Sequence, residues 1–451
     1  MAKGIKFKKG LDINLKGKAP EEFISISKSE SYAIVPDNYT GLTPKVVVRE
    51  GDKVKAGTAL IIDKTRQDIR LVSPVSGTVT GVNRGEKRKV LSVTVKPDAQ
   101  TEYEQFGAKD PKTLDIEGVK AAILAAGVWP FIKQRPYDRI ANPQDEPRDI
   151  FVTAYDSAPL ATNFDFIVKG EEDVLQTGLD ALAKLTEGKV YLGVKKGSPL
   201  KAMQGVEVVE LEGPHPIGNV GVLINHLKPV NKGETVWTLN AADLLYIGRV
   251  FKQGIADFSR TVALTGAELK ERGYAKVVAG CTIESLTVGK IADESKHVRI
   301  ISGNVLTGAK VTREDYLGAY NNQITVIPEG DDVDEFVGWA TPGFGKYSVS
   351  RTYPSGLLGC KNTEYNIDAR IRGGKRAMIM SNEYDRVFPF DILPEYLLKA
   401  IITYDIDKME NLGIYEVAPE DFALCEFVDT SKIELQAIVR RGLDLLYKEM
   451  N

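Results

Sequence analysis

The sequence predicts a multidomain α+β protein in which a small β domain precedes an α/β domain, a second small β domain and a helical C-terminal region. A chain of 451 residues has room for about three domains of roughly 150 residues each. Short runs of β-branched residues fill its first part, whereas helical and strand patterns alternate in its second part. These changes of pattern place the domain boundaries at 1–99, 100–257, 258–330 and 331–451.

The composition is that of an ordinary globular protein without a surface for nucleic acid. Lys and Arg number 59 and Asp and Glu number 62, which gives a formal net charge of −3. Such a balance leaves few cations to neutralise phosphates, so we expect no nucleic-acid partner. With 43% hydrophobic and 27% charged residues, the chain can bury a substantial core, and this excludes wholesale disorder.

The cysteines and histidines indicate neither a metal site nor a disulfide framework. Cys281, Cys360 and Cys425 lie too far apart for a CxxC motif, and the three histidines form no HExxH pair. No apolar run approaches the roughly 20 residues of a membrane-spanning helix, and the basic N-terminus lacks the apolar core of a signal peptide. We therefore expect a cytoplasmic protein that meets a membrane only through a partner or a surface patch.

The first β domain contains expected strands at 46–48, 58–62, 77–82 and 90–95. Two of its segments, VREGDKVKAG and LVSPVSGTV, resemble the barrel-sandwich fold of biotinyl and lipoyl carrier domains. A carrier needs a lysine at a hairpin tip, but the matching position holds Arg66, whose guanidinium stays protonated and accepts no acyl group. We expect a structural barrel; a loaded carrier would have to use Lys64, which is out of register.

The second domain alternates helices and strands, which indicates βαβ units around a largely parallel sheet. Helices are expected at 116–126, 171–185 and 241–251, and strands at 150–154, 189–194 and 206–211. A Rossmann-type nucleotide site needs a GxGxxG turn, and residues 100–255 contain none. The nearest glycine turn carries Trp129 and Phe131 in the space that phosphates would need, so we predict a degenerate Rossmann-like domain without a cofactor.

Residues 127–137 (GVWPFIKQRPY) form the predicted ligand site. Trp129, Phe131 and Tyr137 could stack on a flat ring. Lys133 and Arg135 could hydrogen-bond a carbonyl or stabilise a reduced anion. The alternative is a proline-constrained crossover whose aromatic side chains belong to the core.

The remaining regions return to strands and then to helices. Strands are expected at 261–264, 298–301 and 324–327, with one short helix near Glu268. The stretch 339–374 is Gly-rich and irregular, and helices follow at 394–402 and 434–448. Gly442 interrupts the apolar pattern of the last helix.

A set of short strings occurs along the chain in a specific order. They are SPVSG at 73–77, GVW at 127–129, RPY at 135–137, GPHP at 213–216, WTLN at 237–240, RGGKRAM at 372–378 and FDILP at 390–394. In these strings the chain resembles the A-type subunit of bacterial Na+-translocating NADH:quinone reductases (Na+-NQR), a family related to the C-type subunit of the Rnf complex. The resemblance implies that 258–330 is a β-grasp (SLBB-like) domain and that both middle domains resemble a flavin-binding subunit of respiratory complex I.

The resemblance also implies a function. Members of the family are peripheral subunits on the cytoplasmic face of the bacterial inner membrane, in a six-subunit enzyme that passes electrons from NADH to a quinone and exports Na+. Flavins and the iron–sulfur cluster belong to the other subunits, and the A-type subunit is linked to quinone binding. We therefore expect quinone at the 127–137 site and no redox activity for the chain alone. The alternative is a cofactor-free adaptor that binds no quinone. A stand-alone diaphorase is a further possibility, and the missing glycine loop argues against it.

Overall fold

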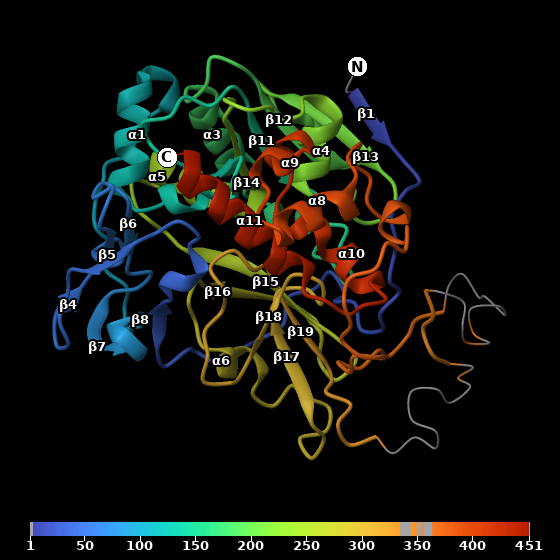
Figure 1. The fold of residues 1–451 in the computed structure, drawn as a ribbon. Coiled ribbons are helices and arrows are strands. Elements are labelled where there is room, and N and C mark those ends of the chain that lie inside the picture. The colour runs from blue at the N-terminus through green and yellow to red at the C-terminus, as the bar shows by residue number, and fades with distance from the viewer. Residues whose placement is uncertain are drawn as a thin grey trace.

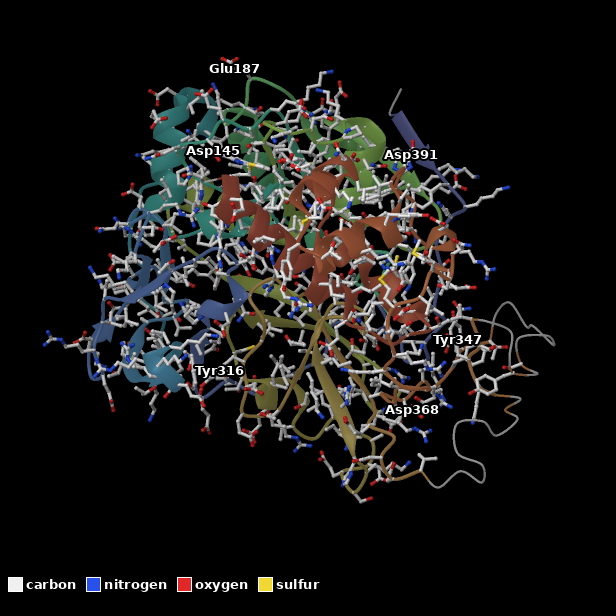
Figure 2. All side chains as sticks on the ribbon, in the orientation of Figure 1. Asp145, Glu187, Tyr316, Tyr347, Asp368 and Asp391 are labelled. Carbon is white, nitrogen blue, oxygen red and sulfur yellow. The ribbon has the colours of Figure 1, made fainter. Side chains whose placement is uncertain are left out.

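The computed structural model describes residues 3–333, 343, 345–349, 353, 355 and 363–450. These residues form four sheets and a helical C-terminal region (Figure 1), so the predicted α+β fold class is confirmed. Charged side chains such as those of Glu187 and Asp391 project from the periphery (Figure 2). The stretch predicted to be irregular, 339–374, lies partly outside the described residues, as does Cys360.

Two small sheets build the first β domain, with strand orders β2-β8-β7-β4 and β3-β5-β6. Their strands are β2 (Tyr32–Ile34), β3 (Pro44–Val46), β4 (Lys53–Val54), β5 (Ala59–Asp63), β6 (Arg70–Val72), β7 (Gly77–Arg84) and β8 (Val90–Pro97). The four expected strands correspond to β3, β5, β7 and β8. Leu60, Ile61 and Val93 are fully buried. Because Leu60 and Ile61 are consecutive and point to opposite faces of β5, this strand is covered on both faces.

A seven-stranded sheet in the order β1-β13-β12-β11-β14-β9-β10 forms the α/β domain. Its strands are β1 (Lys3–Lys6), β9 (Lys133–Arg135), β10 (Arg139–Ile140), β11 (Ile150–Ala154), β12 (Val190–Lys195), β13 (Glu207–Glu212) and β14 (Val236–Asn240). The helices are α1 (Ile116–Ala125), α2 (Phe164–Val168), α3 (Glu172–Ala183), α4 (Val220–Leu227) and α5 (Ala241–Gln253). Strands β1 and β11–β14 run parallel, as the βαβ pattern predicts, whereas β9 and β10 add antiparallel strands at one edge.

The third domain has a five-stranded sheet in the order β16-β15-β19-β17-β18. Its elements are β15 (Ser259–Thr265), β16 (Gly273–Val278), α6 (Ile283–Thr287), β17 (Val298–Ser302), β18 (Ala309–Val311) and β19 (Gln323–Pro328). The predicted helix near Glu268 is wrong. Gly266 has a φ of 113° and Leu269 bridges to Ile291, and these two constraints hold the segment in a turn instead.

The C-terminal region contains α8 (Pro394–Ile402), α9 (Ile406–Asn411), α10 (Ala423–Val428) and α11 (Leu435–Met450). Helix α11 runs without a break through Gly442. A Cβ atom at this position would lie 2.9 Å from side-chain atoms of Ile401, so the glycine lets α8 and α11 pack closely. It marks a helix contact and not a helix end.

Residues 3–31, which we call the N-terminal strap, cross three domains before the first β domain begins. Strand β1 pairs in parallel with β13, and the strap then hydrogen-bonds the C-terminal region from Lys16 N to Tyr365 O at 2.9 Å. Further on, Ile24 N donates to Tyr274 O at 2.8 Å in the third domain. The first residues of the chain therefore connect elements that are distant in sequence.

Candidate functional site

The strand order of the α/β sheet reverses between β11 and β14. From β11 the chain passes outward through β12 and β13, and it then returns to the other side of β11 as β14. Ligands of open α/β sheets bind in the crevice outside the carboxyl ends of the strands at such a reversal. A cavity of about 410 Å³, which we call the central cleft, lies there beside Thr153 of β11 and Asn240 of β14.

Three domains supply the walls of the central cleft. The α/β domain contributes the ends of β11 and β14 and the turn before α4, and the third domain contributes the loop before β19. The C-terminal region contributes Glu420 and Gln436. Most of the lining groups are amides, hydroxyls or charged side chains; they include Lys133, Tyr155, Asp156, His215, Asn219, Thr238, Asp243, Asn304, Thr307, Tyr320, Asn321, Asn322, Gln323, Glu420 and Gln436. The cleft is thus suited to the polar part of a ligand.

Of the five predicted site residues, the structure brings Phe131 and Lys133 together in this cleft. The Lys133 ammonium lies 4.3 Å from the ring centroid of Tyr320, which is a cation–π contact. The ring of Phe131 meets the same tyrosine edge-on, with centroids 5.7 Å apart. A cation and two aromatic rings, drawn from two domains, therefore form one wall.

Trp129 and Arg135 are placed away from the cleft. Trp129 is fully buried, donates from Nε1 to Ala141 O at 2.8 Å and packs edge-on against Trp237. Arg135 donates to Asp421 at 2.8 Å and to Glu420 at 3.0 Å. Both side chains are fixed by protein partners.

Tyr137 lines a different cavity, of about 320 Å³. Its ring meets the ring of Tyr447 edge-on at a centroid distance of 5.2 Å. The guanidinium of Arg66 lies along this cavity too, where it is bound to Asp63 at 2.8 Å and to Gly41 O at 3.0 Å. Arg66 also donates to Ile140 O of the α/β domain at 3.4 Å, so the residue at the carrier position is part of a domain contact.

The glycine turn at 125–131 does not suit a nucleotide or flavin phosphate. Gly127 has a φ of 71°, and a Cβ atom there would lie 2.3 Å from the side chain of Val72 in the first β domain. The cavity beside it measures about 30 Å³, which is water-sized. Because Val72 covers the turn and Trp129 and Phe131 fill it, no bare backbone faces a ligand at this point.

Sequence reasoning missed the buried ion pair at the floor of the cleft. Asp243, at the start of α5, lies 3.0 Å from the guanidinium of Arg260 on β15. Burial raises the pKa of Asp243 to about 6, although the charge of Arg260 acts in the opposite direction. Nothing in the local pattern of either segment indicates this pair, because it forms only when the second and third domains meet.

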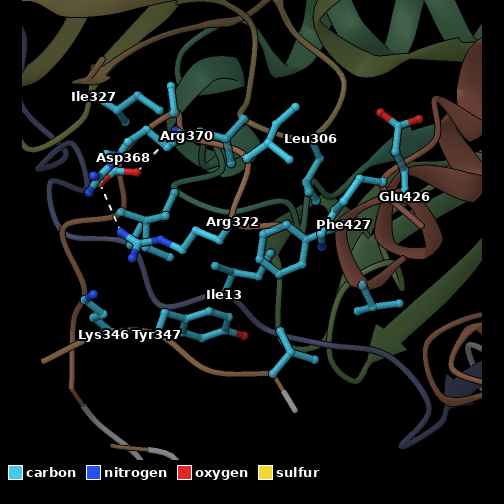
Figure 3. Close-up of a pocket in the computed structure, with 18 of the residues that line it drawn as sticks. Ile13, Leu306, Ile327, Lys346, Tyr347, Asp368, Arg370, Arg372, Glu426 and Phe427 are labelled. Atoms are coloured by element: carbon cyan, nitrogen blue, oxygen red, sulfur yellow. Dashed lines mark hydrogen bonds and ion pairs between the residues drawn. The ribbon is translucent and has the colours of Figure 1, made fainter. Parts of the chain in front are cut away.

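Sequence reasoning also missed a second cavity, of about 620 Å³, which we call the apolar pocket (Figure 3). It lies between the third domain, the strap and the C-terminal region. Its apolar lining includes Ile13, Leu15, Ile301, Val305, Leu306, Ile327, Tyr347, Phe427 and Val428. Arg370 and Arg372 stand at one side, where both are bound to Asp368, at 2.6 Å and 3.0 Å.

Two kinds of feature are absent from the described part of the chain. None of the helices within these residues is both long and apolar enough to cross a membrane. Nor do these residues contain a group of three or more His, Cys, Asp or Glu side chains that could hold a metal ion.

Comparisons with known proteins identify the family. Curated relatives from Pasteurella multocida and Neisseria meningitidis serogroup B, each named as the A-type subunit of the Na(+)-translocating NADH-quinone reductase, are 36% identical over 99% of this chain and 100% of theirs. The chain belongs to this family. Family models match at 5–98 (NqrA N-terminal barrel-sandwich hybrid domain), 114–256 (NqrA second alpha/beta domain) and 261–313 (NQRA C-terminal domain, of the SLBB type).

The family assignment confirms the resemblance, the barrel-sandwich and SLBB domains and membership of a Na+-translocating NADH:quinone reductase. Other subunits of that complex are thus partners of this chain. One solved structure, an NAD+-reducing [NiFe]-hydrogenase in the H2-reduced state, aligns with 75% of this chain and 62% of its own at 11% identity and a TM-score of 0.39. This distant likeness adds nothing to the assignment.

Proposed function

We propose that the chain is a peripheral subunit on the cytoplasmic side of the bacterial membrane and that its central cleft binds the headgroup of the quinone. In this proposal the six-subunit complex carries its flavins and iron–sulfur cluster in the other subunits, which deliver the electrons. This chain contributes binding and shielding. It holds no cofactor of its own.

The observation that carries the proposal is the wall formed by Phe131, Lys133 and Tyr320. A quinone headgroup is flat and presents carbonyl oxygens as hydrogen-bond acceptors, so it needs an aromatic surface and a donor. Lys133 supplies a charged donor beside two rings. Its positive charge also favours the reduced, more anionic form of the ligand.

Equilibrium dialysis of the full chain against a tailless quinone tests the proposal. We expect Lys133→Met to weaken binding by about 10- to 150-fold, because a hydrogen bond to a charged group contributes about 1.5–3 kcal/mol. Lys189→Met, which removes an exposed lysine outside the cleft, is the matched control and should bind like the wild type. Undetectable binding by the wild type, or equal affinity in both variants, contradicts the site.

One observation favours the adaptor function as the second candidate. Large apolar side chains project from α8 and its two ends: Leu393 is 55% exposed, Tyr396 56% and Tyr404 66%. Such a surface is typical of a protein contact. An adaptor would lose assembly with the other subunits after Tyr396→Asp while the wild type shows no quinone binding.

A further inference from the structure

The central cleft and the apolar pocket meet at one residue. Leu306, in the loop between β17 and β18, lines both cavities. Its neighbours divide between the two sides, since Asn304 and Thr307 line the cleft and Val305 lines the pocket. Figure 3 shows the Leu306 side chain among the apolar groups of the pocket.

The geometry points to a single two-compartment site in which the apolar pocket holds the isoprenoid tail of the quinone and Leu306 forms the threshold between tail and headgroup. This inference rests on the proposed function. It adds a binding region far from residues 127–137 and assigns it a ligand chemistry, that of a branched hydrocarbon chain.

Hydrogen bonds hold the threshold in place. The side-chain oxygen of Asn304 accepts from Leu306 N at 2.8 Å and from Thr307 N at 3.0 Å, which fixes the turn. On the opposite side, the Gln436 amide donates to Leu306 O at 3.0 Å. Gln436 N donates in turn to the Glu426 carboxylate at 2.9 Å.

These hydrogen bonds connect residues that line the two cavities. Gln436 lines the cleft and Glu426 lines the pocket, so this chain of hydrogen bonds runs from the lining of one cavity to the lining of the other. The backbone of the threshold is anchored, whereas the Leu306 side chain engages in apolar contacts alone. A rotation of this side chain is therefore the smallest change that would open a passage.

The two compartments differ in chemistry as the two parts of a quinone differ. The cleft presents amides, hydroxyls and Lys133, while the pocket presents Ile301, Ile327, Phe427 and other apolar groups. Charged side chains also line the pocket, and several of them are paired: Asp368 binds Arg370 and Arg372, and Glu434 binds Lys375. The charged lining residues are Arg299, Lys346, Asp368, Arg370, Arg372, Lys375, Glu383, Glu426, Lys432 and Glu434. At about 620 Å³, the pocket lies in the range of about 300–1,000 Å³ typical of ligand sites. A wholly polar ligand such as a nucleotide would leave it unused.

Quinones with one headgroup and zero, one or two isoprene units test the inference by equilibrium dialysis against the full chain without detergent. We expect the affinity of the wild type to rise about 10-fold or more from the tailless to the two-unit compound, because buried hydrocarbon contributes roughly 25 cal/mol per Å². Val305→Trp, which fills the pocket from a position outside the cleft, should abolish this gain and leave the affinity for the tailless quinone within about twofold.

Two further variants test whether the loss of the gain comes from the size of the new side chain and not from a disturbed fold. Leu306→Met conserves the volume and should retain the gain, whereas Leu306→Trp obstructs the passage between the two cavities and should reduce it. Circular dichroism and urea midpoints show that each variant is folded. A wild-type affinity independent of tail length, or a full gain in both tryptophan variants, overturns the inference. If tail dependence is absent but tailless quinone binds, the proposed function survives; if no quinone binds, both fail.

Discussion

The guanidinium of Arg135 lies 2.8 Å from the carboxylate of Asp421, and both side chains are almost completely buried. The pair connects β9 of the α/β domain to the segment before α10 in the C-terminal region. Desolvation opposes such a pair, and it is stable only while both partners are present. It therefore makes the two regions mutually dependent.

We expect Arg135→Met to lower the free energy of unfolding by about 3–5 kcal/mol, because it leaves the carboxylate of Asp421 buried without a counter-charge. Urea unfolding at pH 7 measures the change. Lys189→Met, at an exposed ion pair, should cost less than about 1 kcal/mol. The double variant Arg135→Met/Asp421→Leu should recover much of the loss; a single variant as stable as the control would contradict this account.

His215 gives the stability a specific pH dependence. Burial lowers the pKa of His215 to about 4, so between this value and the unfolded value of about 6.5 only the unfolded chain binds the proton. Its contribution is complete above pH 6.5 and is lost as the pH falls toward 4. We expect the urea midpoint to fall between pH 7.5 and pH 5 by less in His215→Asn than in the wild type. Equal falls in both proteins would exclude His215 as the cause.

Gly127→Ala should loosen the contact between the first two domains. The new Cβ would lie 2.3 Å from the side chain of Val72, and an alanine at a φ of 71° is strained. We expect a loss of about 2 kcal/mol or more in stability, measured by urea unfolding. Val72→Ala should relieve part of the clash, so the double variant should exceed Gly127→Ala in stability. If Gly127→Ala has the same urea midpoint as the wild type, the turn can shift without a loss of stability, and this account is contradicted.

Trp129→Phe distinguishes packing from ligand binding at the first predicted site residue. The substitution leaves Ala141 O without its donor and opens space beside Trp237. We expect a loss of about 1–3 kcal/mol in stability together with an affinity for tailless quinone within about twofold of the wild type. Thermal melts and dialysis measure the two quantities. If the variant is folded but binds quinone much more weakly than the wild type, Trp129 belongs to the ligand site after all.

Much of the fold follows from local pattern. The strands at 150–154 and 324–327 are recognisable as short apolar runs rich in β-branched residues, and the helix at 241–251 is recognisable as a longer apolar segment. The helix predicted near Glu268 is wrong because a contact distant in sequence overrides the local pattern. Its residues have adequate helical preference, but a bridge from Leu269 to Ile291 imposes a turn, and local preference does not report such a partner.

The candidate site was harder to predict because it is assembled from distant segments. Residues 127–137 are consecutive, but their side chains reach different places. Lys133 lines the cleft, whereas Arg135 is bound to Asp421. Tyr137, whose φ is positive, lines another cavity. Tyr320 and Leu306 come from the third domain, where no motif distinguishes them. A pattern read along the chain finds residue types suited to a ligand but not the walls that they share.

The N-terminal strap has a consequence for biosynthesis. Its residues leave the ribosome well before β13, Tyr274 and Tyr365, with which they pair. The nascent chain must therefore keep β1 unpaired until β13 (Glu207–Glu212) has emerged, and contacts so distant in sequence form slowly. Until β1 docks, the open edge of β13 is available to any other strand, so the period after β13 emerges is one in which this protein needs protection from aggregation.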